Sequence, residues 1–237
     1  MQFSAALTLK LHMPYNFQHE VSLLYKYILF DFDGTVFDTV EGITKSARYA
    51  INKFGLDDSL EFLRQFAGPP LTDKFMEVYG FTREQAEQAV AYFRERYVPV
   101  GLYECSIFPG VKEMLTELKA AGFVLGIATS KPQHLAEKLL AGEGMTELFD
   151  AICGSGVSAN DDSKASVLRR AMEQLKADRA ATVLVGDTKY DVLGAKSCGI
   201  DSIGVRYGYA AEDELEQAGA SHIVDNVEEL TKLIMGK

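Results

Sequence analysis

Cysteine is scarce in this sequence, and its scarcity excludes two kinds of cross-link. The chain of 237 residues has three cysteines, Cys105, Cys153 and Cys198, far apart and without a C-x-x-C spacing. Its four histidines are scattered, with no spacing typical of metal ligands. Neither a disulfide framework nor a zinc site is therefore expected, and the thiols are predicted to be reduced.

Long apolar runs are also missing. No stretch approaches the roughly 20 apolar residues that a membrane-spanning helix needs. Near the start, Phe3 to Leu9 is apolar, but no basic stretch precedes it and Lys10 and His12 interrupt it, unlike a secretory signal. We expect no membrane partner and a cytoplasmic location.

Positive charge is in deficit. The chain has 24 Lys and Arg against 34 Asp and Glu, a formal net charge of -10. This balance argues against nucleic acid or an anionic membrane surface as the main partner. An anionic substrate would need a local positive centre that the overall charge does not supply.

Three apolar segments end in polar residues, as buried strands of a parallel sheet do. Tyr27 to Phe32 leads into an Asp-Gly pair, Phe123 to Ala128 precedes Thr129, and Thr182 to Val185 precedes Gly186 and Asp187. In parallel sheets, ligands bind outside the carboxyl ends of the strands. The sequence therefore predicts that these polar ends share one site.

Helical patterns alternate with these strands, for instance Pro109 to Ala121 and Ser163 to Ala177, where Ser163 is the expected cap. The alternation predicts an α/β fold with a doubly wound, Rossmann-like parallel sheet. Residues 41–106 break it with four helical patterns, at 43–54, 59–66, 71–79 and 83–97. We expect an N-terminal extension of residues 1–25, a core of residues 26–40 and 107–237, and a small helical cap domain of residues 41–106 inserted after the first strand.

Two acids two positions apart carry the strongest chemical signal. Asp31 and Asp33 lie at the end of the first predicted strand, before Gly34 and Thr35. One carboxylate can attack phosphorus, and a second can protonate the leaving oxygen and then activate water. The alternative is a plain turn, which Asp-Gly often makes.

A second acidic strand end, Gly186-Asp187, is followed by Asp191. Together with Asp31, Asp187 offers the hard oxygen ligands that Mg²⁺ takes alongside substrate phosphate. A cation there would offset the repulsion between an anionic nucleophile and an anionic substrate. Alternatively, Gly-Asp caps the following helix.

Thr129, Ser130 and Lys164 are candidate phosphoryl contacts. The Thr129 hydroxyl can donate to a phosphoryl oxygen, helped by N–H groups at the next helix start, and Lys164 can place a positive charge there. Capping by Thr129 or Ser130, and a solvated Lys164, are the plainer interpretations.

These residues, in the order Asp31-Phe32-Asp33-Gly34-Thr35, Thr129, Lys164 and Gly186-Asp187 through Asp191, resemble the four motifs of the haloacid dehalogenase superfamily. The helical insertion resembles that of its phosphoglycolate phosphatase-like group. The resemblance implies Asp31 as nucleophile and metal ligand, and Asp33 as acid/base that also offers its carbonyl to the metal. It implies Thr129 and Lys164 as phosphoryl binders, Asp187 as metal ligand and Asp191 as its support.

The sequence departs from the family pattern at two places. Ser130 stands where many relatives have Asn, and Lys164 is followed by Ala165 rather than proline, so Lys131 is a second candidate for the positive contact. Gly68-Pro69 resembles the substrate-facing loop of the family's cap, although an ordinary helix connection also fits. The expected substrate-binding residues are therefore Gly34, Gly68, Pro69, Thr129, Ser130 and Lys164.

The expected function is a Mg²⁺-dependent phosphatase that hydrolyses a small phosphate monoester through an aspartyl phosphate. Asp33 favours phosphoryl chemistry, because dehalogenating relatives lack an acid at that position. A phosphomutase and a catalytically silent phosphate-binding protein are the rivals. Phosphoglycolate, a nucleoside 5′-monophosphate and a sugar phosphate stay open as substrates, as do a monomer and a homodimer.

Overall fold

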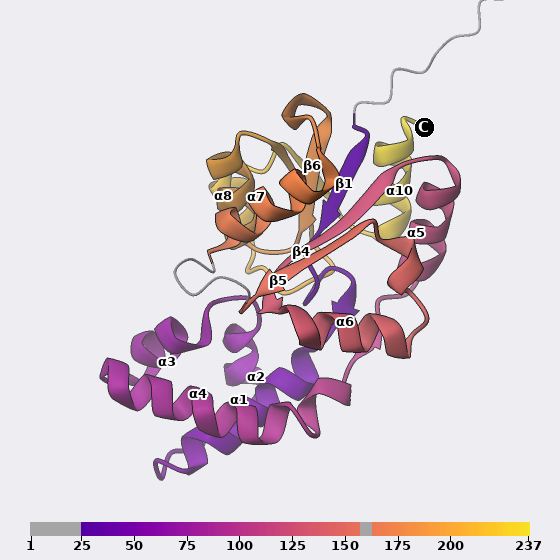
Figure 1. Ribbon diagram of the computed structural model, residues 1–237. Helices are drawn as coiled ribbons and strands as arrows, with labels where there is room; N and C mark the ends of the chain where they lie inside the picture. Colours follow the sequence, from indigo (N-terminus) through magenta and orange to yellow (C-terminus); the bar gives the residue numbers. More distant parts are fainter. Residues whose placement is uncertain (1–24, 157–162) are drawn as a thin grey trace, which may run out of the picture.

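The computed structural model describes residues 25–156 and 163–237 (Figure 1). The extension predicted for residues 1–25 lies outside the described residues except for Tyr25. That side chain is buried, and its hydroxyl donates to Asp201 Oδ2 over 2.9 Å. No helix within the described ranges is long and apolar enough to cross a membrane.

The core is a six-stranded parallel sheet in the order β5-β4-β1-β6-β7-β8. Its strands are β1 (Tyr27–Phe30), β4 (Val124–Pro132), β5 (Ala151–Ser155), β6 (Thr182–Gly186), β7 (Asp201–Val205) and β8 (His222–Val224). The chain builds outward from β1 to β5 and then returns to the other side of β1 at β6. This is the doubly wound arrangement that the sequence predicts.

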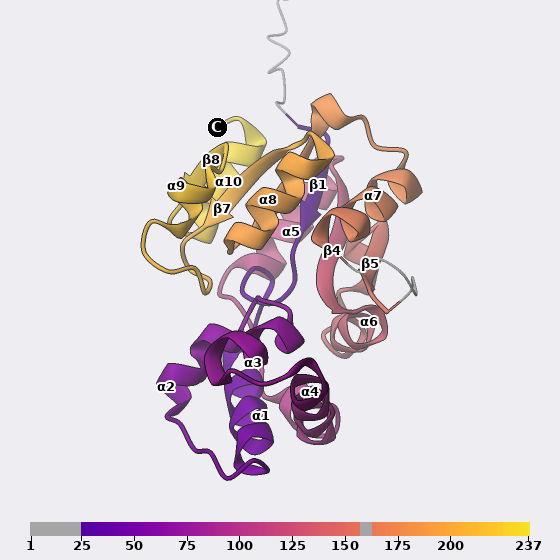
Figure 2. The same ribbon diagram turned by 90° about the vertical axis from the view of Figure 1, so that its left-hand side faces the viewer.

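Helices cover both faces of the sheet. They are α5 (Val111–Ala120), α6 (Gln133–Gly142), α7 (Lys164–Leu175), α8 (Lys189–Cys198), α9 (Glu214–Ala218) and α10 (Val227–Met235). Along β1, Ile28 and Phe30 pack with buried residues of α5, α6 and α10, whereas Leu29 packs with those of α7 and α8. Figures 1 and 2 show α7 and α8 on one side of the sheet and α5 and α10 on the other. Because both faces of β1 are buried, its sequence is continuously apolar.

The predicted elements are present, and several of them have shifted ends. Strand β1 stops at Phe30, two residues short of the prediction, while β4 runs on to Pro132 with an irregular register after Ala128. Helix α7 begins where expected, because the Ser163 side chain accepts a hydrogen bond from the N–H of Ser166. Single turns of 3₁₀ helix are η1 (Arg64–Phe66), η2 (Gly101–Tyr103), η3 (Thr146–Leu148) and η4 (Arg179–Ala181).

A helical insertion, residues 40–103, separates β1 from the rest of the sheet. It contains α1 (Val40–Asn52), α2 (Leu60–Leu63), α3 (Leu71–Tyr79) and α4 (Arg83–Tyr97). A short antiparallel pair, β2 (Phe37–Asp38) and β3 (Ser106–Ile107), joins its two ends and was not predicted. Figure 1 shows the four helices beyond the edge of the sheet where β4 and β5 end. The insertion therefore faces the carboxyl ends of the strands.

Candidate active site

The strand register brings the predicted polar ends to one edge of the sheet. Phe30 of β1 is level with Ile127 of β4 and Val185 of β6. The N–H of Asp31 continues the ladder by donating to the Val185 carbonyl over 2.8 Å. Asp31 and Asp187 therefore lie just beyond β1 and β6, and Thr129 lies in the last part of the adjacent strand β4, at the same edge.

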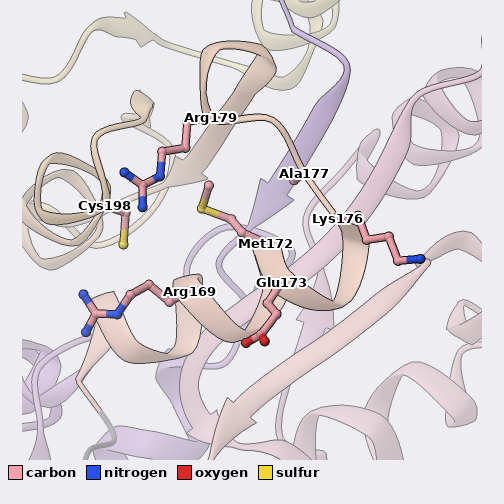
Figure 3. A pocket seen from close by; sticks show the side chains of 7 residues that line it. All are labelled: Arg169, Met172, Glu173, Lys176, Ala177, Arg179 and Cys198. Carbon is pink, nitrogen blue, oxygen red and sulfur yellow. The ribbon is translucent and has the colours of Figure 1, made fainter.

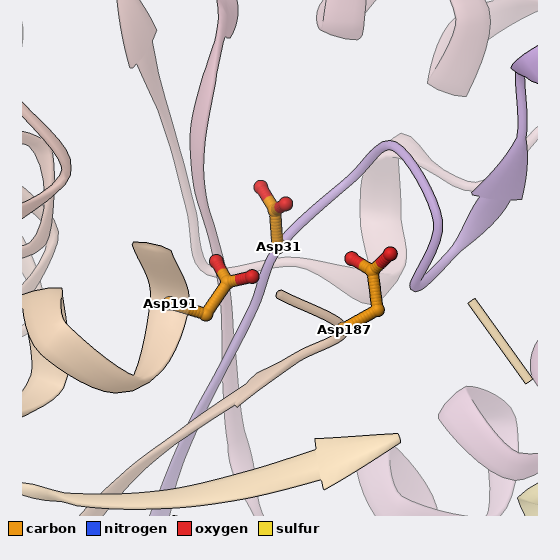
Figure 4. Close-up of side chains that lie close together, drawn as sticks. All are labelled: Asp31, Asp187 and Asp191. Carbon is orange, nitrogen blue, oxygen red and sulfur yellow. The ribbon is translucent and has the colours of Figure 1, made fainter. Parts of the chain in front are cut away.

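Three carboxyl groups meet at this edge. Oxygens of Asp31, Asp187 and Asp191 all lie within 4.8 Å of one another, and all three residues are buried. Figure 4 shows Asp31 between the other two, with the three carboxyl groups projecting to the same side. We call these residues the carboxylate cluster.

Burial and mutual repulsion make the cluster costly to ionise. Burial raises the pKa of Asp31 to about 6, and the neighbouring Asp191 carboxylate adds to the rise while Lys164 opposes it. Burial also raises the pKa of Asp187 well above its usual value, and Asp191 and Asp31 raise it further. The cluster therefore favours protons or a cation over three bare charges.

Lys164 supplies the local positive centre that the sequence required. It is the first residue of α7, and its Nζ lies 2.6 Å from an oxygen of Asp31 and 2.6 Å from one of Asp191. Burial lowers the pKa of Lys164, but Asp191 and Asp31 outweigh that effect and raise it, so the ammonium stays charged. Its stem fits closely because residue 194 of α8 is glycine: a Cβ there would lie 2.7 Å from Lys164 Cγ.

The cluster meets the requirements of a divalent cation site. Three carboxylates and one ammonium leave two negative charges without compensation among these described side chains. Lys164 Nζ lies 2.6 Å from Asp31 Oδ1 and from Asp191 Oδ1, and these two buried oxygens have no other hydrogen-bond donor within the described residues. A hard cation such as Mg²⁺ takes carboxylate oxygens of this kind.

Two further contacts fix Asp187. Thr35 Oγ1 donates to Asp187 Oδ1 over 3.2 Å, and the N–H of Tyr209 donates to Oδ2 over 2.8 Å. Gly34 lies against the same carboxyl group with φ +85°, and a Cβ there would lie 2.1 Å from Oδ2. Only glycine fits this position. The observed role of Gly34 is close contact with Asp187, and its predicted role toward substrate stays a prediction.

Asp191 has two partners at once. Its Oδ2 accepts hydrogen bonds from the N–H and the hydroxyl of Thr188, the N-cap of α8, over 3.0 and 2.9 Å. Its Oδ1 faces Lys164. The N-cap of α8 is therefore Thr188 and not Asp187, so the interpretation of Gly-Asp as the helix cap is wrong, and both Asp187 and Asp191 belong to the carboxylate cluster.

The two residues predicted at the end of β4 differ in exposure. Thr129 is buried, and its Oγ1 accepts from the N–H of Lys131 over 3.1 Å, which leaves the hydroxyl hydrogen to donate elsewhere. Ser130 is exposed. Thr129 is thus buried at the edge of the sheet that carries Asp31, whereas Ser130 lies on the surface.

Asp33 lies outside the carboxylate cluster. Its side chain is 17% exposed and pairs with Lys131, whose Nζ donates to Oδ1 over 2.9 Å and to Oδ2 over 3.2 Å. Thr39 Oγ1 donates to Oδ1 over 2.8 Å. The metal contact that the resemblance implies for Asp33 is through its backbone carbonyl, and the side-chain contacts do not test it.

Sequence reasoning missed the partners of Lys131 and Tyr209. Lys131 Nζ also donates to the hydroxyl of Tyr97, in α4, over 2.5 Å. The Tyr209 hydroxyl accepts from the N–H of Thr39 over 2.6 Å and donates to Asp38 Oδ1 over 3.0 Å. Tyr97 is the last residue of a helical pattern, and nothing in the local sequence signals either contact.

The Gly68-Pro69 loop reaches the site from the helical insertion. It lies between η1 and α3, and Gly68 adopts φ +103°. A Cβ at Gly68 would lie 3.0 Å from Cγ2 of Thr188, the cap residue that supports Asp191. The insertion therefore contacts the core beside the carboxylate cluster.

A hollow of about 360 Å³ lies elsewhere, between α7 and α8 (Figure 3). Arg169, Met172, Arg179 and Cys198 are among its lining residues. Arg179 precedes β6 whereas Asp187 follows it, so this hollow belongs to the opposite edge of the sheet. It contains none of the predicted site residues.

The chain is similar in sequence and in structure to known hydrolases and phosphatases. A family model described as haloacid dehalogenase-like hydrolase matches residues 28–205. A 5′-nucleotidase of Pseudomonas aeruginosa is 36% identical over 216 residues, covering 91% of this chain and 98% of the relative. A phosphoglycolate phosphatase of Cupriavidus necator is 34% identical, covering 90% and 95%. The crystal structure of a predicted phosphatase from Clostridium acetobutylicum has a TM-score of 0.86 and 42% identity, covering 90% of this chain and 100% of that one.

Proposed function

Because the chain belongs to the haloacid dehalogenase-like hydrolases and acts on phosphate esters, we propose that it is a Mg²⁺-dependent phosphatase that forms an aspartyl phosphate at Asp31. The observation that carries this proposal is the buried carboxylate cluster with Lys164 beside it. The cluster combines a nucleophile, a cation site and a positive centre at one edge of the sheet.

The cation ligands are Asp31, Asp187 and the backbone carbonyl of Asp33, with Asp191 in support. When bound, Mg²⁺ supplies positive charge that offsets the repulsion between the nucleophile and the phosphate ester. Support for this ligand set comes from the two uncompensated charges and from the buried Asp31 and Asp191 oxygens that have Lys164 as their one partner among the described residues. Thr35 and the N–H of Tyr209 keep the Asp187 carboxyl group oriented.

Thr129 and Lys164 hold the phosphoryl group. The Thr129 hydroxyl donates to one phosphoryl oxygen, and the Lys164 ammonium, already 2.6 Å from Asp31, neutralises charge on another. Holding the ester in line with the nucleophile is a large part of the catalysis of phosphoryl transfer. Lys164 is favoured over Lys131, because Lys131 is occupied by Asp33 and Tyr97.

The reaction has two steps. Asp33 enters the first step protonated, with a proton in place of one of its Lys131 hydrogen bonds. An Asp31 oxygen bonds to phosphorus while the bond to the leaving oxygen breaks, and Asp33 gives that proton to the leaving oxygen. Water then attacks the aspartyl phosphate, Asp33 takes a proton from the water, and the bond from Asp31 to phosphorus breaks. Both carboxyl groups return to their starting states, as the two roles of an acid/base require.

The helical insertion acts as a cap domain of residues 41–106 on a core of residues 26–40 and 107–237. Support comes from the position of its helices beyond the carboxyl ends of the strands and from the Gly68 contact with Thr188. In this role, Gly68 and Pro69 face the leaving group, and Ser130 and Gly34 border the phosphate. The cap excludes bulk water during the first step.

The names of two relatives point to two substrate classes. The relative at 36% identity is named a 5′-nucleotidase, and the one at 34% is named a phosphoglycolate phosphatase. We therefore place nucleoside 5′-monophosphates and phosphoglycolate first among the small phosphate monoesters, ahead of sugar phosphates. A phosphomutase remains the rival, and isomerisation of a sugar 1-phosphate without release of free phosphate would establish it.

The test is a phosphate-release assay over a panel of these esters, with and without Mg²⁺, on wild type and Asp31→Asn. We expect Mg²⁺-dependent turnover by wild type, and a loss of several orders of magnitude in Asp31→Asn, because the variant lacks the nucleophile. Circular dichroism verifies that the variant is folded. Near-wild-type turnover by Asp31→Asn would refute the nucleophile assignment.

A further inference from the structure

Asp33 is held by a group of buried side chains from three separate segments. Lys131, at the end of β4, donates to both of its carboxyl oxygens. Thr39, just before α1, donates to Oδ1 over 2.8 Å. Tyr97, near the end of α4, accepts from Lys131 over 2.5 Å. The acid is therefore linked both to the central sheet and to the helical insertion.

Asp33 is more exposed to solvent than the residues that hold it. The side chain of Asp33 is 17% exposed, whereas that of Lys131 is 3% exposed. Thr39 and Tyr97 are 1% and 5% exposed. Among these four residues, the carboxyl group alone is open to an arriving molecule, and it projects from a buried support.

The ammonium of Lys131 is fully engaged in this support. Its three hydrogens match the two Asp33 oxygens and the Tyr97 hydroxyl in number. Its Nζ also lies 4.9 Å from the centre of the Tyr97 ring and 5.6 Å from that of Phe32. A phosphoryl group could reach Lys131 only by displacing these partners.

We propose that Lys131 is a positioning residue for Asp33, and that Tyr97 of the helical insertion holds Lys131 in place for this role. The inference rests on the proposed phosphatase function, in which Asp33 protonates the leaving oxygen. Lys131 does not touch the substrate. It fixes the direction in which Asp33 presents its carboxyl group.

Two substrates with different leaving groups test this role. An alkyl phosphate needs a proton on its departing alkoxide, whereas p-nitrophenyl phosphate releases a stable anion that needs none. Loss of acid positioning therefore slows the first substrate selectively. The value of kcat/KM reports the steps up to phosphoryl transfer, so later hydrolysis of the aspartyl phosphate does not obscure the comparison.

For Lys131→Met with Mg²⁺ present, we expect kcat/KM to fall about 100-fold or more on the alkyl phosphate and to change less than about threefold on p-nitrophenyl phosphate. Asp33→Asn gives the same selective pattern more strongly. Lys164→Met, which removes the other buried lysine, lowers kcat/KM on both substrates alike because it removes a phosphoryl contact.

Tyr97→Phe is the second variant, since it removes one hydroxyl and keeps the ring. We expect a smaller but equally selective loss on the alkyl phosphate. Tyr103→Phe is its matched control, because Tyr103 is 54% exposed in the same insertion, and it leaves both values unchanged. If Lys131→Met does not fold, Tyr97→Phe alone decides.

Equal losses on both substrates in Lys131→Met and Tyr97→Phe would overturn the positioning role and assign Lys131 to phosphoryl binding. Faster turnover of the alkyl phosphate would overturn it too, because Lys131 would then restrain Asp33. In either case wild type still hydrolyses both esters, so the proposed function stands. Failure of wild type on both esters would instead remove the proposed function itself.

Discussion

At the scale of single residues, Asp31 combines a buried place in the carboxylate cluster with an unfavourable charge. Burial raises its pKa from 3.8 to about 6, so the folded, metal-free chain binds this proton more tightly than the unfolded chain does. Between pH 4 and 6 the folded state therefore carries more protons. Its free energy of unfolding must fall as the pH rises through this window.

The corresponding prediction concerns Asp31→Asn without metal. The variant has no carboxylate to ionise at this position, so it gains stability relative to wild type as the pH rises from 4 to 7, by about 3 kcal/mol for a shift of about two pKa units. Urea unfolding of both proteins in a chelator, at pH 4 and pH 7, measures the difference. If the free energies of unfolding of the two proteins changed equally between pH 4 and pH 7, ionisation of Asp31 would not destabilise the fold.

Two residues of the carboxylate cluster could be predicted because each follows a recognisable strand end, whereas the third, Asp191, lies within α8. Asp31 and Asp187 come directly after apolar runs, and parallel strands place such ends together. The partners of Asp33 could not be predicted in this way. Lys131 is 98 residues away in the chain and Tyr97 lies 34 residues before Lys131, and no local pattern encodes contacts of that range.

At the scale of elements, periodicity and capping signals located the long helices better than the short strands. Helix α4 spans Arg83–Tyr97, as its pattern predicts. Strands β2 and β3 have two residues each and exist only as partners of each other, so neither has a pattern of its own. The sequence therefore indicated the helical insertion but not the pair that encloses it.

Helix α4 begins with a capping box that can be tested. The Thr82 hydroxyl accepts from the N–H of Gln85 over 3.3 Å, and the Gln85 side chain accepts from the N–H of Thr82 over 2.9 Å. We expect Thr82→Ala to lower the free energy of unfolding by about 1 kcal/mol, since an N–H loses its partner. Chemical denaturation measures the loss. Thr82→Ser keeps the hydroxyl and is the control, and an equal loss in both variants would argue against the cap.

At the scale of the whole molecule, the net charge is -10, and one site carries a local excess of negative charge. Among the described residues, the carboxylate cluster concentrates negative charge beside only one ammonium. A cation that binds there binds the folded state alone, so it stabilises the fold by mass action. Metal binding can thus be measured without turnover.

We expect Mg²⁺ at 100 times its dissociation constant to raise the free energy of unfolding by about 2.7 kcal/mol. Asp187→Asn should lose this gain, because it removes a proposed ligand. Thermal unfolding in MgCl₂ and in NaCl of equal ionic strength separates site binding from screening of the net charge. An identical response of wild type to both salts would exclude a specific cation site.

The paired strands β2 and β3 also determine how the helical insertion is attached. Phe37 lies opposite Ile107 and Asp38 opposite Ser106, so the chain leaves and re-enters the core at adjacent points. Neighbouring strands are about 4.8 Å apart, a gap that one or two residues can bridge. The four helices are thus joined to the core through one pair of adjacent chain crossings, so the β1 connection of the sheet does not depend on the length of the insertion.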